Sequence, residues 1–571
     1  MKFLIKKIYI ILFLIIIFLI ETETLAKDSD VVYKRKNISN YFSGIIFANK
    51  DYNDKAFKHL KKVQSLKNKH SKFNVEFIKT LVLLEKFDQA SAFSKSVWTE
   101  DEFLFEADLL LGLDYFLKED YTNAERHFER LNKISRYNLF FKDFIGNVLI
   151  AWSKASQGNQ KDSFKFLKKI PKPYHHLKKI QNIFLQCYFD ASGTQKLFSE
   201  LIQDDTYNFS RYNFFLVNYL LSKDKTIEVK KIIQDSRKKH NSNLLIKQTE
   251  VFFNGESKKI KNFFNCKNPK DSLAEFFYVI ANLHSNEADY KLSNFYLKIS
   301  LFLNDKFLTN KALLAENFFY QKKNELSIDI YHSLKSIGSS YSWYASKSIA
   351  QILLNTKGKK YSISNLETEF KLLLNPNFEH YYELANFYKE NEYYKESIKY
   401  YSLALKEIKK DHFLVPKILD RRGTSFERID DWENAEKDLI ESLRILPNQA
   451  HVLNYLAYTW IDKGINVDEG LEMLKKAASL RENDGYIIDS LGWAYYVKKD
   501  YAKAEPFLQR AVELLPLDPI INDHYADTLW MLDKNIQARY FWNYILKLND
   551  VEQKLKDTIS KKLIFGISKK L

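Results

Sequence analysis

Small residues recur at a fixed interval in the C-terminal third of this chain, among apolar side chains spaced three or four positions apart. The first series consists of Gly423, Ala457, Gly492 and Ala526, at steps of about 34 residues. The second series consists of Ala435, Gly470, Ala504 and Ala538, at the same steps. Spacings of three and four place the apolar side chains on one face of a helix. The pattern therefore predicts a pair of helices that is repeated along the chain.

One interval shows the predicted pair in detail. The first helix carries Leu491, Gly492 and Tyr495 on one face, and the second carries Ala504, Leu508 and Ala511. One interval in each series is a residue longer than the others, and the extra residue lies between Ala457 and Gly470. We place it in the turn before Asn466, where Gly464 can end the first helix in a left-handed conformation.

The same period continues toward the N-terminus in a less regular form. Gly44, Phe47, Ala56 and Leu60 recur two periods later as Gly112, Tyr115, Ala124 and Phe128. Ala281, His284, Ser293 and Leu297 recur one period later as Ala315, Phe318, Ser327 and Tyr331. Residues 177–270 keep helical spacing, but their repeat boundaries cannot be assigned. At this period, residues 37–549 hold about 15 helix pairs.

These linked positions resemble the tetratricopeptide repeat (TPR), most clearly over residues 378–549. The resemblance implies an all-α fold, a right-handed α-solenoid of helical hairpins with small residues where the helices cross. We expect degenerate repeats over residues 27–376 and well-formed repeats over residues 377–549. Residues 550–571 are expected to form an amphipathic capping helix that closes the last repeat.

The overall composition agrees with a helical chain that lacks a nucleic-acid partner. The 571 residues include only 14 Gly and 9 Pro, which is too few for a β-sandwich, a barrel or a disordered chain. The formal net charge is +16, but the lysines are scattered along the predicted solvent faces instead of forming one basic tract. We therefore expect no nucleic acid to bind.

The two cysteines, Cys187 and Cys266, are too few for a disulfide-rich scaffold or a multi-cysteine metal site. The stretch of sequence between them corresponds to more than two hairpins along a solenoid. At that separation we expect two buried free thiols. The alternative is a single disulfide, formed in an oxidising compartment.

The N-terminal segment has the pattern of a secretory signal. Lys2, Lys6 and Lys7 precede an apolar run from Ile8 to Ile20. The small residues Thr24 and Ala26 then stand where a signal peptidase cleaves. We predict a signal peptide over residues 1–26 and export of the rest. An uncleaved membrane anchor is the alternative, and any other membrane association is expected only through partners.

The resemblance also implies which side chains line the inner surface of the solenoid. In tetratricopeptide domains they lie three before and one after the small residue of each first helix, and again one turn further on. The predicted partner-binding groove consists of Asp420, Asn454, Tyr458, Asp489, Trp493, Tyr496, Asp523, Asp527 and Trp530. Acidic, amide and aromatic groups of this kind suit an extended peptide. The alternative is that these residues only bond adjacent hairpins to one another.

No catalytic or metal-binding motif stands out in the sequence. The HExxH, GxxxxGK[ST] and GxSxG patterns are absent, and the twelve histidines do not pair at metal-binding helical spacing. Repeats also leave little room for a catalytic module outside residues 177–270. We therefore expect a protein that is not an enzyme and that uses no cofactor and no metal.

The segment from Asn454 to Tyr495 resembles envelope tetratricopeptide proteins of Gram-negative bacteria. Some of these are outer-membrane lipoprotein adaptors that bring a carboxyl-terminal processing protease to cell-wall hydrolases. The resemblance implies a scaffold in the periplasm or cell envelope that binds protein partners through its concave groove, although this chain lacks the lipid-bearing cysteine of those adaptors. The alternative function is a non-catalytic subunit of polysaccharide synthesis or export that contacts glycans.

Overall fold

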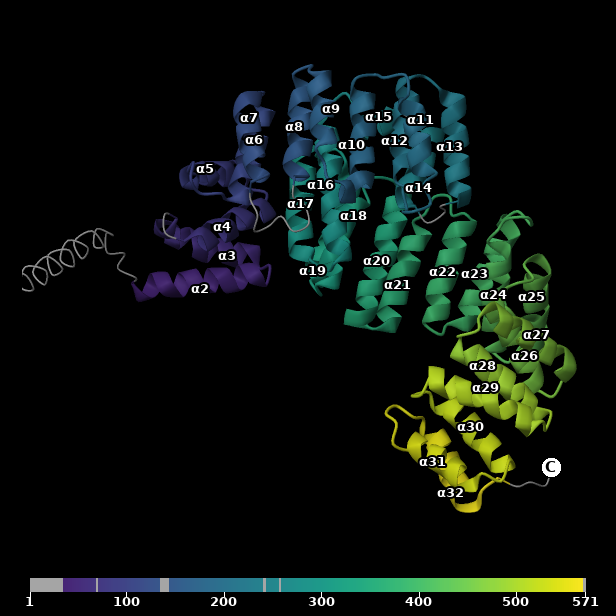
Figure 1. Cartoon of the computed structure of the whole chain (residues 1–571). Helices are drawn as coiled ribbons and strands as arrows, with labels where there is room; N and C mark the ends of the chain where they lie inside the picture. Colours follow the sequence, from purple (N-terminus) through teal and green to yellow (C-terminus); the bar gives the residue numbers. More distant parts are fainter. Residues whose placement is uncertain (1–33, 68–69, 134–142, 240–242, 256–257, 568–571) are drawn as a thin grey trace, which may run out of the picture. The chain divides into compact units, whose positions relative to one another are not determined.

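The computed structural model describes residues 34–67, 70–133, 143–239, 243–255 and 258–567. Within these ranges all regular structure is helical and no strand occurs, which confirms the predicted all-α solenoid of helical hairpins (Figure 1). Within each unit, successive helices pack as pairs, from α2 with α3 in the first unit to α30 with α31 in the second. The predicted signal peptide over residues 1–26 lies outside the described residues.

The chain divides into two compact units, and the first covers Met1–Thr356. Its first hairpins contain α2 (Arg35–Asn49), α3 (Asn53–Leu60), η1 (Lys61–Leu66), α4 (Ser71–Leu83), α5 (Phe87–Val97), α6 (Phe105–Leu117), α7 (Tyr121–Leu131), α8 (Ile145–Ser156) and α9 (Gln160–Lys168). The middle hairpins contain η2 (Lys172–Tyr174), α10 (His175–Tyr188), α11 (Thr194–Ile202), α12 (Tyr212–Ser222), α13 (Thr226–Lys239), α14 (Leu244–Asn254) and α15 (Lys258–Phe263). The last elements are α16 (Pro269–Asn286), α17 (Tyr290–Leu303), η3 (Leu308–Asn310), α18 (Lys311–Tyr320), α19 (Asn324–Leu334) and α20 (Ser339–Lys357).

The second unit covers Lys357–Leu571. Its helices are α21 (Lys359–Lys371), α22 (Phe378–Glu390), α23 (Tyr394–Glu407), α24 (Val415–Glu427), α25 (Trp432–Ile445), α26 (Ala450–Asp462), α27 (Val467–Leu480), α28 (Gly485–Val497), α29 (Tyr501–Leu514), α30 (Pro519–Met531), α31 (Asn535–Ile545) and α32 (Gln553–Phe565). The even-numbered helices from α22 to α30 are the first helices of their hairpins. The described part of the predicted capping segment forms α32, which packs against α31.

Glycine lets the two helices of a hairpin approach closely. A Cβ atom on Gly112 would lie 2.4 Å from Cε1 of Phe128, on the second helix of the same hairpin. A Cβ atom on Gly492 would lie 2.6 Å from Cγ of Leu508, at the equivalent place. These distances are too short for a real side chain, so the small residues are packing positions, as the repeat pattern predicted.

Replacing Gly112 by alanine should lower the free energy of unfolding by about 1–3 kcal/mol, because the added methyl overpacks the hairpin. In an uncrowded helix the same change normally adds stability, because alanine is the better helix former. Urea unfolding of the chain, followed by circular dichroism, measures the difference. Gly193→Ala is the matched control, since nothing lies within 4 Å of the added Cβ. Equal stability of the two variants would contradict tight packing at Gly112.

The turn between α26 and α27 has the conformation that the sequence predicted. Gly464 has φ +69°, in the left-handed region that glycine tolerates best. Asn466, at the start of α27, also has a positive φ of +47°. The extra residue is therefore absorbed in this turn, and the two helices keep the register of the neighbouring hairpins.

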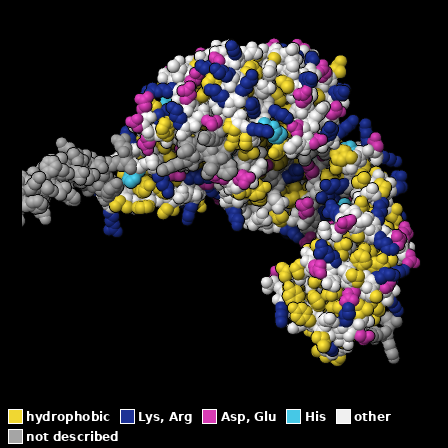
Figure 2. Space-filling view, viewed as in Figure 1, with side chains coloured by type: hydrophobic (Ala, Val, Ile, Leu, Met, Phe, Trp, Pro, Cys, Tyr) yellow, Lys and Arg dark blue, Asp and Glu magenta, His cyan; other side chains and the backbone are white. Residues whose placement is uncertain are grey.

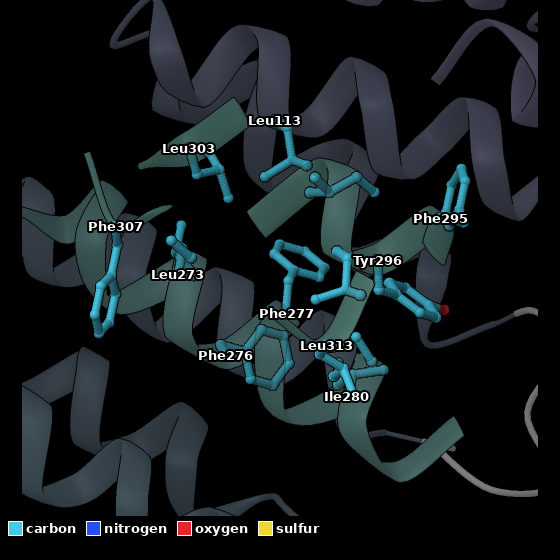
Figure 3. Packing of buried hydrophobic residues seen from close by; sticks show 14 of the residues in the cluster. Leu113, Leu273, Phe276, Phe277, Ile280, Phe295, Tyr296, Leu303, Phe307 and Leu313 are labelled. Carbon is cyan, nitrogen blue, oxygen red and sulfur yellow. The ribbon is translucent and has the colours of Figure 1, made fainter. Parts of the chain in front are cut away.

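In the first unit the chain covers its own inner surface. Helix α16 packs against α8 and α10, and α17 packs against α4. All three of these partners are first helices of earlier hairpins. Figure 3 shows the result, with Leu113 of α6 beside the aromatic side chains of α16 and α17. Helices α6 and α8 are consequently buried on almost every face.

Polar and aromatic contacts hold these distant segments together. Lys291 donates to Glu76 at 2.8 Å, and Gln321 donates to Asp51 at 2.9 Å. The ring of Phe87 stacks on Phe302 with the ring centroids 4.0 Å apart. In this part of the first unit, later helices of the chain therefore cover faces of the earlier first helices.

A buried ion pair joins three segments of the first unit. Arg211 donates two hydrogen bonds of 2.8 Å to the carboxylate of Glu275 and a third of 2.8 Å to Asn310. Its guanidinium also lies 3.8 Å from the ring centroid of Tyr278. Burial raises the pKa of Glu275, and the charge of Arg211 opposes that rise. Arg211 therefore supplies the positive charge that the buried carboxylate of Glu275 needs.

The expectation of two free thiols is wrong, because Cys187 and Cys266 form a disulfide. Their Cα atoms are 5.9 Å apart. The prediction assumed hairpins that stack in sequence order, whereas α16 returns to pack against α10. That return brings the segment just before α16 to the end of α10, where Phe184 and Phe264 also lie in contact with ring centroids 5.4 Å apart.

Positively charged side chains are spread over the visible surface (Figure 2). On the face shown in Figure 2, Lys and Arg side chains are scattered among acidic and polar side chains. Across the described ranges, no helix combines the length and the hydropathy that a membrane crossing requires.

Candidate functional site

The first helices of the second unit line an inner surface that we call the unit-2 groove. Helices α22 and α24 contact each other, as do α26 with α28 and α28 with α30. Each first helix is held in place by the small residues that it packs against its second helix. At Gly423, for example, an added Cβ would lie 3.1 Å from the carbonyl oxygen of Ala435. The side chains of the opposite helix face are left free to line the groove.

One part of the groove is a hollow of about 920 Å³ over α22, α24 and α26. It is lined by Lys389, Glu390, Tyr394, Phe413, Leu414, Pro416, Lys417, Asp420, Arg421, Thr424, Arg428, Leu446, Gln449, His451 and Tyr455. Four of these side chains are cationic and two are acidic, so the lining has a positive excess with histidine neutral. We call this part the cationic hollow.

Arg421 and Lys389 are two half-buried cations in the hollow. Arg421 donates to Oδ1 of Asn386 at 2.6 Å, and its guanidinium lies 5.9 Å from the ring centroid of Tyr382. Burial lowers the pKa of Lys389; the charge of Asp420 opposes this, and the charges of Arg421 and Arg428 add to it. The hollow therefore places several positive charges near one another.

Asp420, the first of the predicted groove residues, lines this hollow. Its Oδ2 atom lies 3.1 Å from Nε2 of His451, which is on the next first helix. The carboxylate is thus engaged between adjacent hairpins. The nearby hydroxyl of Tyr455 donates to Glu427 at 2.7 Å, which makes a second link of the same kind.

Aromatic side chains lie at the centre of the groove. Trp493 stacks on Tyr496 with ring centroids 4.5 Å apart, and on His524 with centroids 4.0 Å apart. Trp493, Tyr496 and Tyr458 are all half-buried. Burial raises the pKa of Tyr458 to about 12, and the charges of Asp462 and Asp489 add to the rise. Together with Trp530 of α30, the aromatic groups that the sequence predicted therefore lie on three consecutive first helices, α26, α28 and α30.

Two further predicted residues lie on α26 and α28; Asp489 is buried and Asn454 is half-buried. Asp489 accepts from Nδ1 of His524 at 2.9 Å. Burial alone would lower the pKa of His524, but the charge of Asp489 outweighs it and raises the pKa. Asn454 has a buried Oδ1 atom without a hydrogen-bond partner among the described residues. Asp489 therefore holds the His524 ring on which Trp493 stacks.

The C-terminal end of the groove is covered by α32. Lys562 donates to both Asp523 and Asp527 at 2.7–2.8 Å, and Trp542 donates to the same two carboxylates at 3.1 Å. Burial and the charge of Asp523 raise the pKa of Asp527 to about 7, while Lys562 opposes the rise. Trp530 donates to the carbonyl oxygen of Ile567 at 3.0 Å. All three predicted residues therefore contact the end of the chain.

Comparison with known proteins gives one relative that is named for its repeats. No protein-family model matches the chain. A TPR repeat-containing protein of Pseudomonas aeruginosa is 34% identical over 99 residues, which is 17% of this chain and 17% of that relative. The matched stretch is therefore a small part of both proteins. Its length corresponds to about three helix pairs of the period found here.

This chain is built from tetratricopeptide-like helical repeats.

Several solved structures of helical proteins are similar to parts of this chain. The APC/C hetero-tetramer Cut9–Hcn1 is 12% identical with a TM-score of 0.34, covering 89% of this chain and 98% of that one. Yeast Tom70 is 13% identical with a TM-score of 0.32, covering 92% and 94%. YrrB, described as a TPR protein with an unusual peptide-binding site, is 18% identical with a TM-score of 0.26, covering 31% and 88%. Scores this low carry no argument about function.

Sequence reasoning missed the cations of the hollow. Lys417, Arg421 and Arg428 are spaced by four and seven positions, which places them on one face of α24 together with Thr424. This spacing was a usable signal, but the positions taken from tetratricopeptide domains select Asp420 and pass over its neighbour Arg421. Lys389 comes from another hairpin, and its part in the hollow is visible only in the folded chain.

Proposed function

We propose that this protein is a non-catalytic scaffold that holds other proteins in the unit-2 groove. The observations that carry the proposal are the open cationic hollow over α22, α24 and α26 and the half-buried aromatic residues Tyr458, Trp493 and Tyr496 of α26 and α28. Aromatic and charged side chains on a rigid surface are what protein interfaces use as anchors. In the first unit, by contrast, α16 and α17 cover the corresponding face.

The proposed location is the periplasm or cell envelope of a Gram-negative bacterium. The signal-like pattern over residues 1–26 supports export. The disulfide between Cys187 and Cys266 supports it independently, because structural disulfides persist in oxidising compartments and are rare in the cytosol. Within the envelope, an adaptor for a protease or for cell-wall machinery is the role suggested by the resemblance of residues 454–495.

A glycan-binding role has less support from the geometry of the groove. Sugars stack on exposed, flat aromatic faces. The ring of Trp493 already stacks on both Tyr496 and His524, which reduces the aromatic surface left for a sugar. A protein segment can instead use the edges of these rings together with the neighbouring charges.

Replacing Trp493 and Tyr496 together by alanine should abolish capture of envelope proteins by the immobilised chain. The expected loss follows from the large share of binding energy that central aromatic residues carry. The measurement is affinity capture from envelope extracts, with bound proteins identified by mass spectrometry. Tyr458→Ala is a second variant from the neighbouring hairpin, and it should weaken the same capture.

Tyr540→Ala is the matched control, because Tyr540 is 68% exposed and belongs to the second helix α31, outside the groove. Thermal unfolding of each variant checks that the fold is kept. Capture of the same proteins by the chain and by the Trp493 and Tyr496 variant would rule out the groove as the binding surface.

A further inference from the structure

The cationic hollow contains positive charge that the described part of the chain does not neutralise. No carboxylate within the described ranges lies within ion-pair distance of Lys389, Lys417 or Arg421. Of the two acidic side chains in the lining, Asp420 is engaged by His451, and Glu390 is exposed. Half-buried cations of this kind lose hydration, and the neutral partners of Arg421, Asn386 and the Tyr382 ring, bring no negative charge. An incoming carboxylate offsets that cost.

Apolar side chains stand beside these cations. Phe413 and Leu446, which both line the hollow, are 53% and 50% exposed. Tyr394 and Tyr455 complete the lining at the level of the cations. Large apolar groups exposed next to charged ones are typical of a binding surface, because solvent exposure of such groups is unfavourable unless a partner covers them.

Resting on the proposed function, we infer that the cationic hollow binds an extended acidic segment of the partner protein, with Asp or Glu side chains next to large apolar residues. Arg421 and Lys389 receive the carboxylates, and Lys417 adds long-range attraction, whereas Arg428 is already paired with Glu427 at 3.6 Å. Phe413 and Leu446 cover the apolar residues of the segment. In an extended chain, neighbouring side chains point to opposite sides, so one short segment presents both kinds of group.

The geometry favours a protein segment over a nucleic acid. Asp420 and Glu390 belong to the same lining and would repel a continuous row of phosphates. The positive excess of the lining itself is small. A segment that alternates acidic and apolar residues matches both the charges and the exposed apolar groups, whereas a phosphate backbone matches only the charges.

Fluorescence anisotropy with a labelled synthetic peptide tests the inference on the full chain. The probe consists of repeating Asp-Leu-Asp-Phe units and has an amidated C-terminus, so that only side-chain carboxylates carry negative charge. We expect it to bind at least about tenfold more tightly than the same peptide with Asn in place of every Asp. Added salt should weaken the binding of the acidic peptide.

Lys389→Gln combined with Arg421→Gln should weaken binding of the acidic peptide by at least about tenfold. Lys437→Gln combined with Lys475→Gln is the control, because it removes the same charge from exposed ion pairs on α25 and α27. The control should leave the affinity unchanged. Lys417→Gln alone changes only an exposed side chain of the hollow, and it should give an intermediate loss without affecting folding.

Several outcomes would overturn the inference. Equal binding of the Asp and Asn peptides, or equal weakening by the hollow and control variants, would show only nonspecific attraction to a basic protein. Tighter binding of a single-stranded oligothymidylate, with the same dependence on Lys389 and Arg421, would assign the hollow to nucleic acid. If only this inference is wrong, capture of proteins from envelope extracts should still depend on Trp493 and Tyr496. If the proposed function is wrong, capture should not depend on those two residues either.

Discussion

Replacing Glu275 by leucine should lower the free energy of unfolding by about 3–5 kcal/mol, the largest effect that we expect from a single substitution. The carboxylate is fully buried and accepts two hydrogen bonds from Arg211, whose side chain is only 20% exposed. Without it, the guanidinium keeps its charge and retains neutral partners, Asn310 and the nearby aromatic rings, of which Tyr278 is the nearest. Urea unfolding followed by circular dichroism measures the loss.

Two further variants separate the charge effect from a general loss of packing. In Arg211→Met with Glu275→Leu both charges are removed, so this double variant should be more stable than Glu275→Leu alone. Glu200→Leu removes one partner of the exposed pair with Lys196, whose side chains are 57% and 83% exposed, and it should change little. A double variant that is no more stable than the single one would contradict the argument.

Removing the disulfide should cost about 2–4 kcal/mol of unfolding free energy. The change is Cys187→Ala together with Cys266→Ala, which leaves no reactive thiol behind. The bond joins positions with a sequence separation of 79, and without it the unfolded chain gains conformational freedom. It also joins α10 to the segment before α16, so its loss weakens the point where the first unit folds back on itself.

A reducing agent provides the control for this second prediction. Dithiothreitol should lower the unfolding midpoint of the unaltered chain to about that of the double alanine variant, and it should leave the variant unchanged. Thermal unfolding with and without the reagent measures both. If the reagent did not move the midpoint of the unaltered chain, the disulfide would have no part in its stability.

The two units use the same repeat in different ways. In the first unit, α16 and α17 pack against first helices of earlier hairpins and cover the face that a partner would need. In the second unit, the equivalent face carries the cationic hollow and the aromatic residues Trp493 and Tyr496. This contrast is why the proposed binding function is assigned to the second unit.

The candidate site was predicted only in part, because a list of groove positions does not say what each side chain contacts. Trp493, Tyr496 and Tyr458 were predicted, and the structure places them half-buried in the groove. Asp523 and Asp527 were predicted too, but Lys562 of α32 binds both. Whether these carboxylates also take part in partner binding stays a prediction.

The sequence by itself determined the hairpins, because their packing is local. Gly492 meets Leu508 within one hairpin, and Gly423 meets the backbone of Ala435. Contacts over such short separations repeat with the period of the chain, so a single sequence displays them. The all-α fold and the turn at Gly464 follow from the same short-range pattern.

Only the tertiary structure decided how the hairpins return to one another. The disulfide of Cys187 and Cys266, the ion pair of Arg211 and Glu275, and the meeting of Lys389 with Arg421 in one hollow all join different hairpins. Such contacts depend on the small rotation between successive repeats, summed over several of them. The side chains at each hairpin interface set that rotation together. The total rotation over several repeats therefore cannot be read from any one periodic position in the sequence.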